Sequence, residues 1–441
     1  MRKYLFFVSA AVVLSVVSFI IGKSNMNIAE VTDSSLSVLD SQEALAEQDG
    51  PQKWSSTKPF PQHDVYYPGT EELKPDEMRV IACGTGMPQP RLKQAAACYV
   101  VELGNGDKFI FDMGEGSFER LMALGIPLDQ LNKVFLGHLH LDHAGDFPAF
   151  YFTGPVNNRL TPVRVWGPNG VKPEWGTKAW ADHMVKMWAW EAATRGAAVD
   201  PRGLKLEVNE FDWTAVNNVI YDENGVQVKT VPAIHGEQSV SFILEWNGLT
   251  FAFSSDSLPT KWYAKYAKGA NLAIHECFIP PEMMMARYGF TPQEAVFVGT
   301  QGHTAAQAFG KLMEQTKPVR AVCYHFQNDF DTSLAVHSAI RETYDGPLDL
   351  ATDFMTWNVT KDGVRTRMGV PNHDSFPAPV QMKKNPPDSA AEFPFGELDR
   401  ESIDVPAAEV TNKVIEKFNK EQGTNIFPAY TGMVNQPEKK E

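Results

Sequence analysis

The decapeptide GHLHLDHAGD, residues 137–146, decides how the rest of the sequence is interpreted. It places three imidazoles and a carboxylate within six positions, and packing alone seldom needs such a cluster: His138, His140, Asp142 and His143. The apolar segment KVFL before it is typical of a β-strand. A turn at the end of a strand can direct His138 and His140 to one metal ion and Asp142 and His143 to another. The decapeptide therefore predicts a site for two metal ions.

Short apolar segments that often end in His or Asp recur through residues 78–368. Ten of them stand out: RVIACGTG, CYVVEL, KFIFDMG, KVFLGH, VRVWGP, VQVKTVPAIH, VSFILEW, LTFAFSSD, LAIHECF and AVCYHF. Continuous β-branched segments suit central strands, and the ends of such strands are the usual position of sites in layered α/β folds. We therefore predict an α/β catalytic domain over residues 78–368 whose strands deliver polar side chains to one edge.

In these motifs the sequence resembles the metallo-β-lactamase superfamily, whose HxHxDH motif it matches in full. Within that superfamily it is similar to the ribonuclease Z-like branch, with its secreted arylsulfatase and phosphodiesterase relatives. The resemblance covers about residues 78–368 and includes GTGMPQPR (84–91) and FIFDMGEG (109–116). It implies a four-layer αββα sandwich that binds two zinc ions at one edge.

The resemblance also implies the remaining metal ligands. His235 matches the third histidine of the family, Asp256 the bridging aspartate and His325 the last histidine. We expect one zinc ion at His138, His140 and His235 and the other at Asp142, His143 and His325, with Asp256 between them. Taken without the resemblance, a hydrogen-bonded structural histidine is the more usual interpretation of His235, and Asp256 fits a turn among neighbouring serines.

Two further motifs, HECF (275–278) and GHTAAQA (302–308), are similar to the same branch. The resemblance implies that His303 faces the scissile bond and that Glu276 holds it, which would raise the basicity of the imidazole and fix its tautomer. We expect Asp142 to bind metal and also to orient the nucleophile. A residue of a helix-capping loop is the alternative for His303.

The resulting expectation is an exported metal-dependent hydrolase that uses a hydroxide bridging two zinc ions to cleave small organic sulfate or phosphate esters. A lactonase or lactamase on the same metals is one alternative, and an iron-containing, non-hydrolytic member is another. Four tryptophans between residues 170 and 213 favour an aromatic or apolar substrate if they line the mouth of the site. Packing in a lid or in the core is the other interpretation of these tryptophans.

The charge balance separates the chain from members of the family that cut RNA. Lys and Arg number 40 and Asp and Glu number 54, which gives a net charge of −14. Because such a surface repels a phosphate backbone, we expect no nucleic-acid partner. The sequence indicates no oligomeric state.

The N-terminal 26 residues predict a signal peptide or a membrane anchor. Arg2 and Lys3 precede the uncharged segment 4–22, which is close to the ~20 residues that span a bilayer. We therefore expect the protein in the periplasm or on the outer face of the cytoplasmic membrane, attached to the membrane if the segment is uncleaved. Residues 27–77 are polar and predict a tether and lead-in.

Residues 369–441 predict a proline-rich extension that ends in a helix. Val410, Val414, Ile415 and Phe418 form an apolar stripe at helical spacing, and Gly423 is a plausible end of the helix.

The four cysteines, Cys83, Cys98, Cys277 and Cys323, lack the CxxC spacing of a thiolate zinc site, so any metal must rely on imidazole and carboxylate ligands. The Cys83/Cys98 and Cys277/Cys323 pairs stand near the ends of adjacent predicted strands. Disulfides and buried free thiols both remain open for them.

Overall fold

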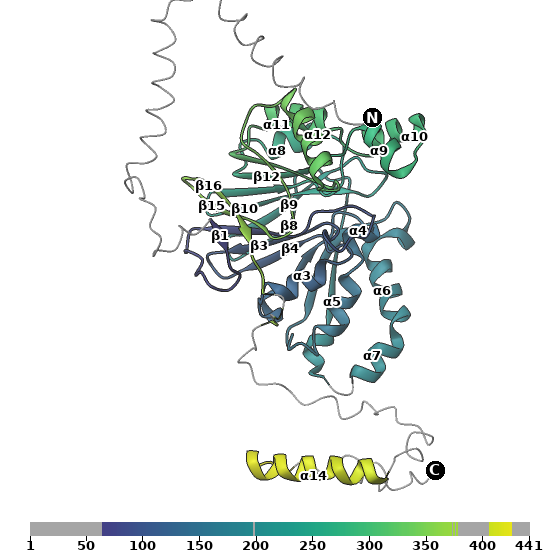
Figure 1. Cartoon of the computed structure of the whole chain (residues 1–441), viewed down its shortest axis with the longest axis vertical. Coiled ribbons are helices and arrows are strands. Elements are labelled where there is room, and N and C mark those ends of the chain that lie inside the picture. The colour runs from purple at the N-terminus through teal and green to yellow at the C-terminus, as the bar shows by residue number, and fades with distance from the viewer. Residues whose placement is uncertain (1–63, 197–198, 373, 375, 378–404, 426–441) are drawn as a thin grey trace, which may run out of the picture. The chain divides into compact units, whose positions relative to one another are not determined.

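The computed structural model describes residues 64–196, 199–372, 374, 376–377 and 405–425. Two β-sheets pack face to face, and helices cover the outer face of each sheet (Figure 1). The predicted αββα sandwich is therefore confirmed. All ten predicted segments form strands in one sheet or the other.

The first sheet has nine strands and combines antiparallel with parallel pairing. Their order across the sheet is β1 (Val65–Tyr66), β16 (Gly363–Gly369), β15 (Met355–Thr360), β2 (Met78–Gly84), β3 (Cys98–Leu103), β4 (Lys108–Phe111), β5 (Lys133–Phe135), β6 (Val163–Pro168) and β7 (Leu206–Phe211). Strands β4 to β7 pair in parallel, so the chain crosses back between them. The crossings contain α3 (Ser117–Ala123), α4 (Leu141–Ala144), α5 (Phe147–Thr153), α6 (Thr177–Met187) and α7 (Ala189–Gly196).

The second sheet has seven strands. Their order is β14 (Leu348–Leu350), β13 (Arg320–Tyr324), β12 (Leu272–Glu276), β11 (Leu249–Phe253), β10 (Val240–Trp246), β9 (Val226–Pro232) and β8 (Asn218–Glu223). Its helices are α8 (Lys261–Tyr266), α9 (Pro281–Tyr288), α10 (Pro292–Phe297), α11 (Ala306–Thr316) and α12 (Phe330–Arg341). A π-helical turn, Val298–Gly302, follows α10 directly.

The core between the sheets is strongly aromatic. Phe111 contacts the rings of Phe135, Phe242 and Phe251 at centroid distances of 5.3 to 5.4 Å. Successive side chains of a strand point to opposite faces of the sheet, so strand β10 contributes to two apolar layers. Phe242 faces the other sheet, whereas Ile243 packs under the outer helices. Each large side chain buried in this way contributes roughly 1.5–3 kcal/mol, so this layer supplies much of the stability.

Strand β1 and the two cysteine pairs add detail that the sequence did not provide. Strand β1 lies in the stretch expected as tether and lead-in, yet it pairs in parallel with β16 and extends the first sheet. Cys83 is joined to Cys98 and Cys277 to Cys323, with Cα atoms 5.0 and 5.6 Å apart. Both pairs that the sequence left open are therefore disulfides.

The predicted C-terminal helix is present as α14 (Val405–Gln422). The predicted signal peptide or anchor, and the tether as far as residue 63, lie outside the described residues. None of the helices in the described ranges combines the length and apolar character that a membrane span requires.

Candidate metal centre

The candidate ligands meet at one edge of the two sheets, where strands end. His138 and His140 lie in the loop that follows β5, and α4 begins directly after them. Helix α4 carries Asp142 and His143 on one turn. The other three candidates follow β9, β11 and β13 respectively: His235, Asp256 and His325. The structure thus brings all seven predicted ligands together from distant parts of the sequence.

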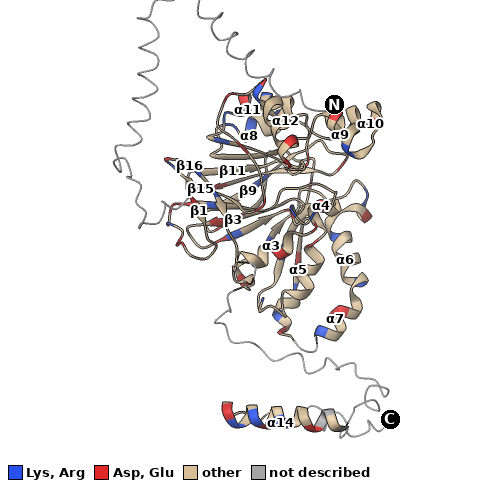
Figure 2. Ribbon diagram, in the orientation of Figure 1, with Lys and Arg blue, Asp and Glu red and all other residues tan. Residues whose placement is uncertain are grey.

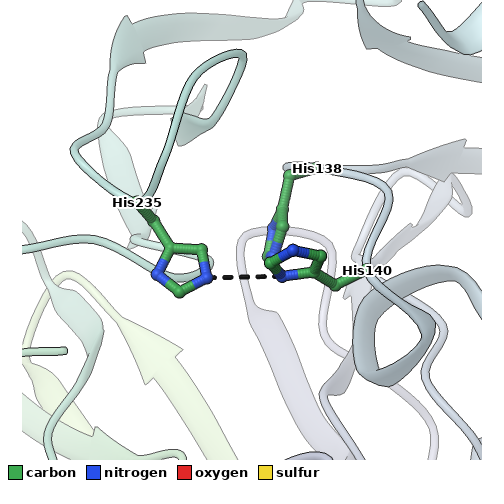
Figure 3. A group of neighbouring side chains, drawn as sticks. All are labelled: His138, His140 and His235. Carbon is green, nitrogen blue, oxygen red and sulfur yellow. Dashed lines mark hydrogen bonds between the residues drawn. The ribbon is translucent and has the colours of Figure 1, made fainter. Parts of the chain in front are cut away.

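The first group consists of His138, His140 and His235 (Figure 3). The Nδ1 atom of His140 lies 3.0 Å from Nε2 of His138 and 3.3 Å from Nε2 of His235. His235 donates its Nδ1 hydrogen to the carbonyl of Gly302 at 2.9 Å, which leaves Nε2 facing the other two rings. A hydrogen bond on the distal nitrogen is the usual way to orient a metal-binding histidine.

The second group consists of Asp142, His143, Asp256 and His325. Asp256 Oδ1 lies 3.2 Å from Nε2 of both His143 and His325. The other oxygen of Asp256, Oδ2, lies 3.6 Å from Nε2 of His235. Asp256 therefore stands between the two groups with one oxygen toward each, which is the position that a bridging ligand requires.

Unpaired buried atoms show that the residues fit metal ions. His143 Nε2 and Asp256 Oδ1 are buried and have no hydrogen-bond partner, although both residues are almost completely enclosed. Leaving such atoms unsatisfied is costly, and a cation between them would satisfy both. Imidazole and carboxylate donors in two groups suit divalent ions such as zinc.

The charges of His138 and Asp256 are also suitable for metal binding. Burial lowers the pKa of His138 well below its usual value, and His143 adds to the effect, so the ring is neutral as a ligand must be. Burial alone would raise the pKa of Asp256, but His143 and His325 outweigh it and hold the pKa well below the usual range. Asp256 is therefore an ionised carboxylate.

Asp112 supports the metal loop, by which we mean residues 137–146, and was not among the predicted site residues. Its Oδ2 accepts hydrogen bonds from His143 Nδ1 and the Ser255 hydroxyl, both at 2.7 Å, and its Oδ1 accepts one from the Gly137 amide at 2.7 Å. The available signal was its place at the end of the strand in FIFDMGEG. That pattern is the same one that identified the ligands.

Three residues of this edge adopt left-handed backbone conformations that side chains other than glycine rarely take. Their φ angles are 56° for Asp112, 49° for Ser255 and 71° for His325. Each such residue costs on the order of 1 kcal/mol or more and persists only where its surroundings enforce it. Asp112 and His325 follow strands directly and Ser255 follows β11 after one residue, so strain is concentrated where the chain must turn side chains into the site.

His303 and Glu276 form the predicted pair beside the first ligand group. His303 Nδ1 lies 3.2 Å from Glu276 Oε2, and its ring stacks on Phe278 at a centroid distance of 4.5 Å. Glu276 also accepts hydrogen bonds from the amides of Ser257 and Thr304, which fix the carboxylate. Burial lowers the pKa of His303, but the charge and hydrogen bond of Glu276 outweigh it and raise the pKa to about 9.

Three of the tryptophans that could have lined the mouth of the site lie in the outer helical layer instead: Trp180, Trp188 and Trp190. Trp180 packs on Phe147 with ring centroids 5.4 Å apart, within the outer helical layer. Trp188 and Trp190 are 44% and 76% exposed on the outer helices. Trp180 and Trp188 line a groove between α5 and α6. The interpretation as helical packing therefore holds for Trp180.

The fold and the site together define a metal-dependent hydrolase. The sequence profile described as the metallo-beta-lactamase superfamily matches residues 93–262. The match covers less than half of the chain, and it agrees with the resemblance to this superfamily and to its ribonuclease Z-like branch.

Two curated relatives are named ribonuclease Z. The one from Mycolicibacterium gilvum is 27% identical over 203 residues, which cover 45% of this chain and 68% of the relative. The one from Mycobacterium marinum is 27% identical over 203 residues, which cover 45% of this chain and 70% of the relative. Among solved structures, the chain is similar to the short form of human tRNase Z, with 19% identity, a TM-score of 0.46, and coverage of 63% of this chain and 98% of that chain.

These relatives correct the expected function and partners. An exported hydrolase of small sulfate or phosphate esters, with no nucleic-acid partner, is contradicted by relatives whose name denotes cleavage of RNA. The expectation from net charge was wrong because a net charge sums over the whole surface, on which Lys and Arg lie among Asp and Glu (Figure 2), and does not give the field at one site. The aromatic-substrate argument rested on tryptophans, of which Trp180 instead packs against a neighbouring helix.

The expected location is corrected by the same relatives. A place in the periplasm or on the outer face of the cytoplasmic membrane does not agree with the ribonuclease Z proteins that the chain matches. That expectation rested only on the hydropathy of residues 4–22, which lie outside the described residues.

Proposed function

We propose that the chain hydrolyses phosphodiester bonds in RNA with two bound zinc ions. The observation that carries this proposal is the position of Asp256 between the two ligand groups, with the His303–Glu276 pair beside them. The ligand sets are His138, His140 and His235 for one ion and Asp142, His143 and His325 for the other, with Asp256 shared. We assign this activity to a catalytic domain at residues 78–368, followed by an extension over residues 369–441.

The bound zinc ions would supply Lewis acidity to a water molecule and to the attacked phosphate. The chain positions the reacting groups around them. Asp142 Oδ2 lies 3.1 Å from His325 Nε2, which places the two assigned ligands of this ion side by side, and a carboxylate has acceptor capacity beyond one such contact. We assign to Asp142 the orientation of the attacking water as well as metal binding.

His303 is suited to act on the leaving oxygen. With a pKa of about 9 the imidazole is protonated near neutral pH and can donate a proton as the P–O bond breaks. Its ring lies 4.9 Å from that of His235, so it borders the first ligand group. Glu276 holds Nδ1, which leaves Nε2 as the atom for proton donation.

The negative net charge is compatible with an RNA substrate because the site would carry its own positive charge. Two bound divalent ions would bring four positive charges, of which Asp142 and Asp256 would offset two, and bound ions are often the largest local charges in a site. An RNA phosphate is therefore attracted to the site itself even where the surrounding surface is acidic.

The test is cleavage of an end-labelled RNA by the metal-replete full chain. We expect cleavage that chelation abolishes and zinc restores, and a loss of at least about a hundredfold in His303→Ala, because general acid catalysis contributes on the order of 10²–10⁴. The exposed His337, on the outer helix α12, provides a matched control, and His337→Ala should cleave normally. A metal-replete protein that leaves RNA intact would overturn the proposal.

A further inference from the structure

An apolar groove lies on the outer side of the metal loop. Its volume is about 650 Å³, and its walls come from the loop, α5, α6 and the turn into α7: Leu139, Leu141, Phe152, Trp180, Met187 and Trp188. Leu141 and Met187 are 70% and 71% exposed although both are large apolar side chains. The charged groups on its wall include Glu191 and Arg195, which pair with each other. The groove is therefore suited to an apolar occupant and poorly suited to a phosphate.

Helix α14 presents a complementary surface. Val410, Val414 and Phe418 recur at intervals of four residues and are 62%, 63% and 48% exposed. Helices in proteins owe most of their stability to the packing of an apolar face. Such a stripe inserted in an apolar groove is a recurring mode of helix recognition.

The connection between the two surfaces is long enough. The carbonyl of Phe376 lies beside Gly125, just after α3, and α3 packs on α5 through Phe118 and Phe150 at a ring distance of 5.8 Å. The described chain therefore leaves the body on the helical layer that contains the groove. Residues 378–404 separate this point from α14. A connection of this length spans up to roughly 90 Å, more than the roughly 50 Å expected for a body of this size.

We propose that α14 docks in this groove of its own chain through Val410, Val414 and Phe418. The covalent connection favours this occupant over a second copy, because two groups joined in one chain can meet at an effective concentration on the order of millimolar. Docked there, α14 covers Leu139 and Leu141, which alternate with His138, His140 and Asp142 in the decapeptide. The helix then restrains the loop that presents these candidate ligands.

Hydrogen exchange of the full-length chain, followed by mass spectrometry, tests the docking. Val414→Asp places a charge in the stripe, whereas Lys420→Asp places one roughly 120° around the helix axis. We expect Val414→Asp to speed exchange in both α14 and α6–α7 by about tenfold or more, since both lose a packed partner. Lys420→Asp should change neither region. Met187→Asp, at an exposed position of the groove, should speed exchange in α14.

Each alternative occupant gives a different result. Exchange in α6–α7 that is the same in Val414→Asp and in the unsubstituted chain would overturn the proposal, as would α14 exchange that Met187→Asp leaves unchanged. Protection of α14 that rises with protein concentration would assign the groove to a second copy. Protection of the groove by added RNA, equal in Val414→Asp and the unsubstituted chain, would assign it to the substrate. All of these readouts are independent of catalysis, so they stand apart from the test of the proposed function.

Discussion

The interior between the sheets and the edge of the same sheets are built in opposite ways. The interior is a stack of aromatic rings, such as Phe111, Phe135 and Phe242, that need only fill space. The edge holds buried imidazoles and carboxylates, two unpaired polar atoms and left-handed residues such as Ser255. The interior therefore contributes stability, whereas the edge consumes some of it to hold a reactive arrangement. Replacements in the two regions should separate stability from activity.

The largest effect is expected on activity, from the edge. Asp256→Ala removes the carboxylate between the two ligand groups, and RNA cleavage should fall by about three orders of magnitude, since several kcal/mol of charge stabilisation depend on the ions. The unfolding midpoint of the metal-free protein should fall only modestly, because the lost attraction to His143 and His325 is partly offset by the removal of a buried carboxylate. Steady-state cleavage and thermal unfolding measure the two quantities.

The exposed carboxylate of Asp222, on β8, provides the matched control, and Asp222→Ala should leave both quantities unchanged. A large fall in the unfolding midpoint of Asp256→Ala, sufficient by itself to explain the loss of cleavage, would contradict the contrast between edge and interior.

The interior should behave in the reverse manner. Phe242→Ala leaves a cavity among the rings of Phe111 and Phe135, and we expect a loss of about 3–5 kcal/mol in the free energy of unfolding. Cleavage per folded molecule should remain within about twofold. Denaturant titration combined with activity at low temperature checks this. A large loss of activity while the protein remains folded would show that the interior shapes the site directly.

Asp112 links the two regions and should give an intermediate effect. Asp112→Asn keeps the size of the side chain but weakens the hydrogen bond that orients His143. Residues that orient a ligand typically contribute 10–100-fold to metal affinity, so the zinc dissociation constant should rise by about that factor. Competition with a chromophoric chelator measures it. Unchanged zinc affinity would reduce Asp112 to a packing role.

The smallest effect is expected on the stability of the protein at low pH, through the ion pairs of Asp329. Arg91, Arg287 and Lys93 hold the pKa of Asp329 at about 2, below its usual value of 3.8. Because the folded-state pKa is depressed, the stabilisation is full above about pH 4 and is lost as the pH falls through about 2. Solvent screening of these partly exposed pairs limits the contribution to about 1 kcal/mol or less. Asp329→Asn should thus lower the free energy of unfolding at pH 7 but less at pH 3.

Metal ligands that are close together in the sequence could be predicted without the family resemblance. His138, His140, Asp142 and His143 stand in one decapeptide, so their spacing alone indicated a metal site. His235, Asp256 and His325 are far apart in the sequence, and only the family resemblance linked them. Their meeting depends on which strands end at the same edge, which local spacing does not encode.

Other features depended on three-dimensional context that no local pattern contains. Asp112 acts through hydrogen bonds to residues distant in the sequence, and only the fold brings Ser255 and His143 to it. Strand β7 has no fully buried residue and strand β8 has only one, so neither gives the apolar signal that marked the central strands. The substrate expectation failed because composition and net charge describe the whole chain, whereas recognition depends on local surface and bound ions.

Zinc-dependent cleavage of RNA is the decisive measurement for a site of two metal ions. Metal-stripped protein should be titrated with zinc while cleavage of a labelled RNA and bound metal are both followed. We expect that cleavage is absent at the start and rises until about two zinc ions are bound per chain, and that Asp256→Ala prevents this rise. Full cleavage by the metal-stripped protein, or none at saturating zinc, would contradict it.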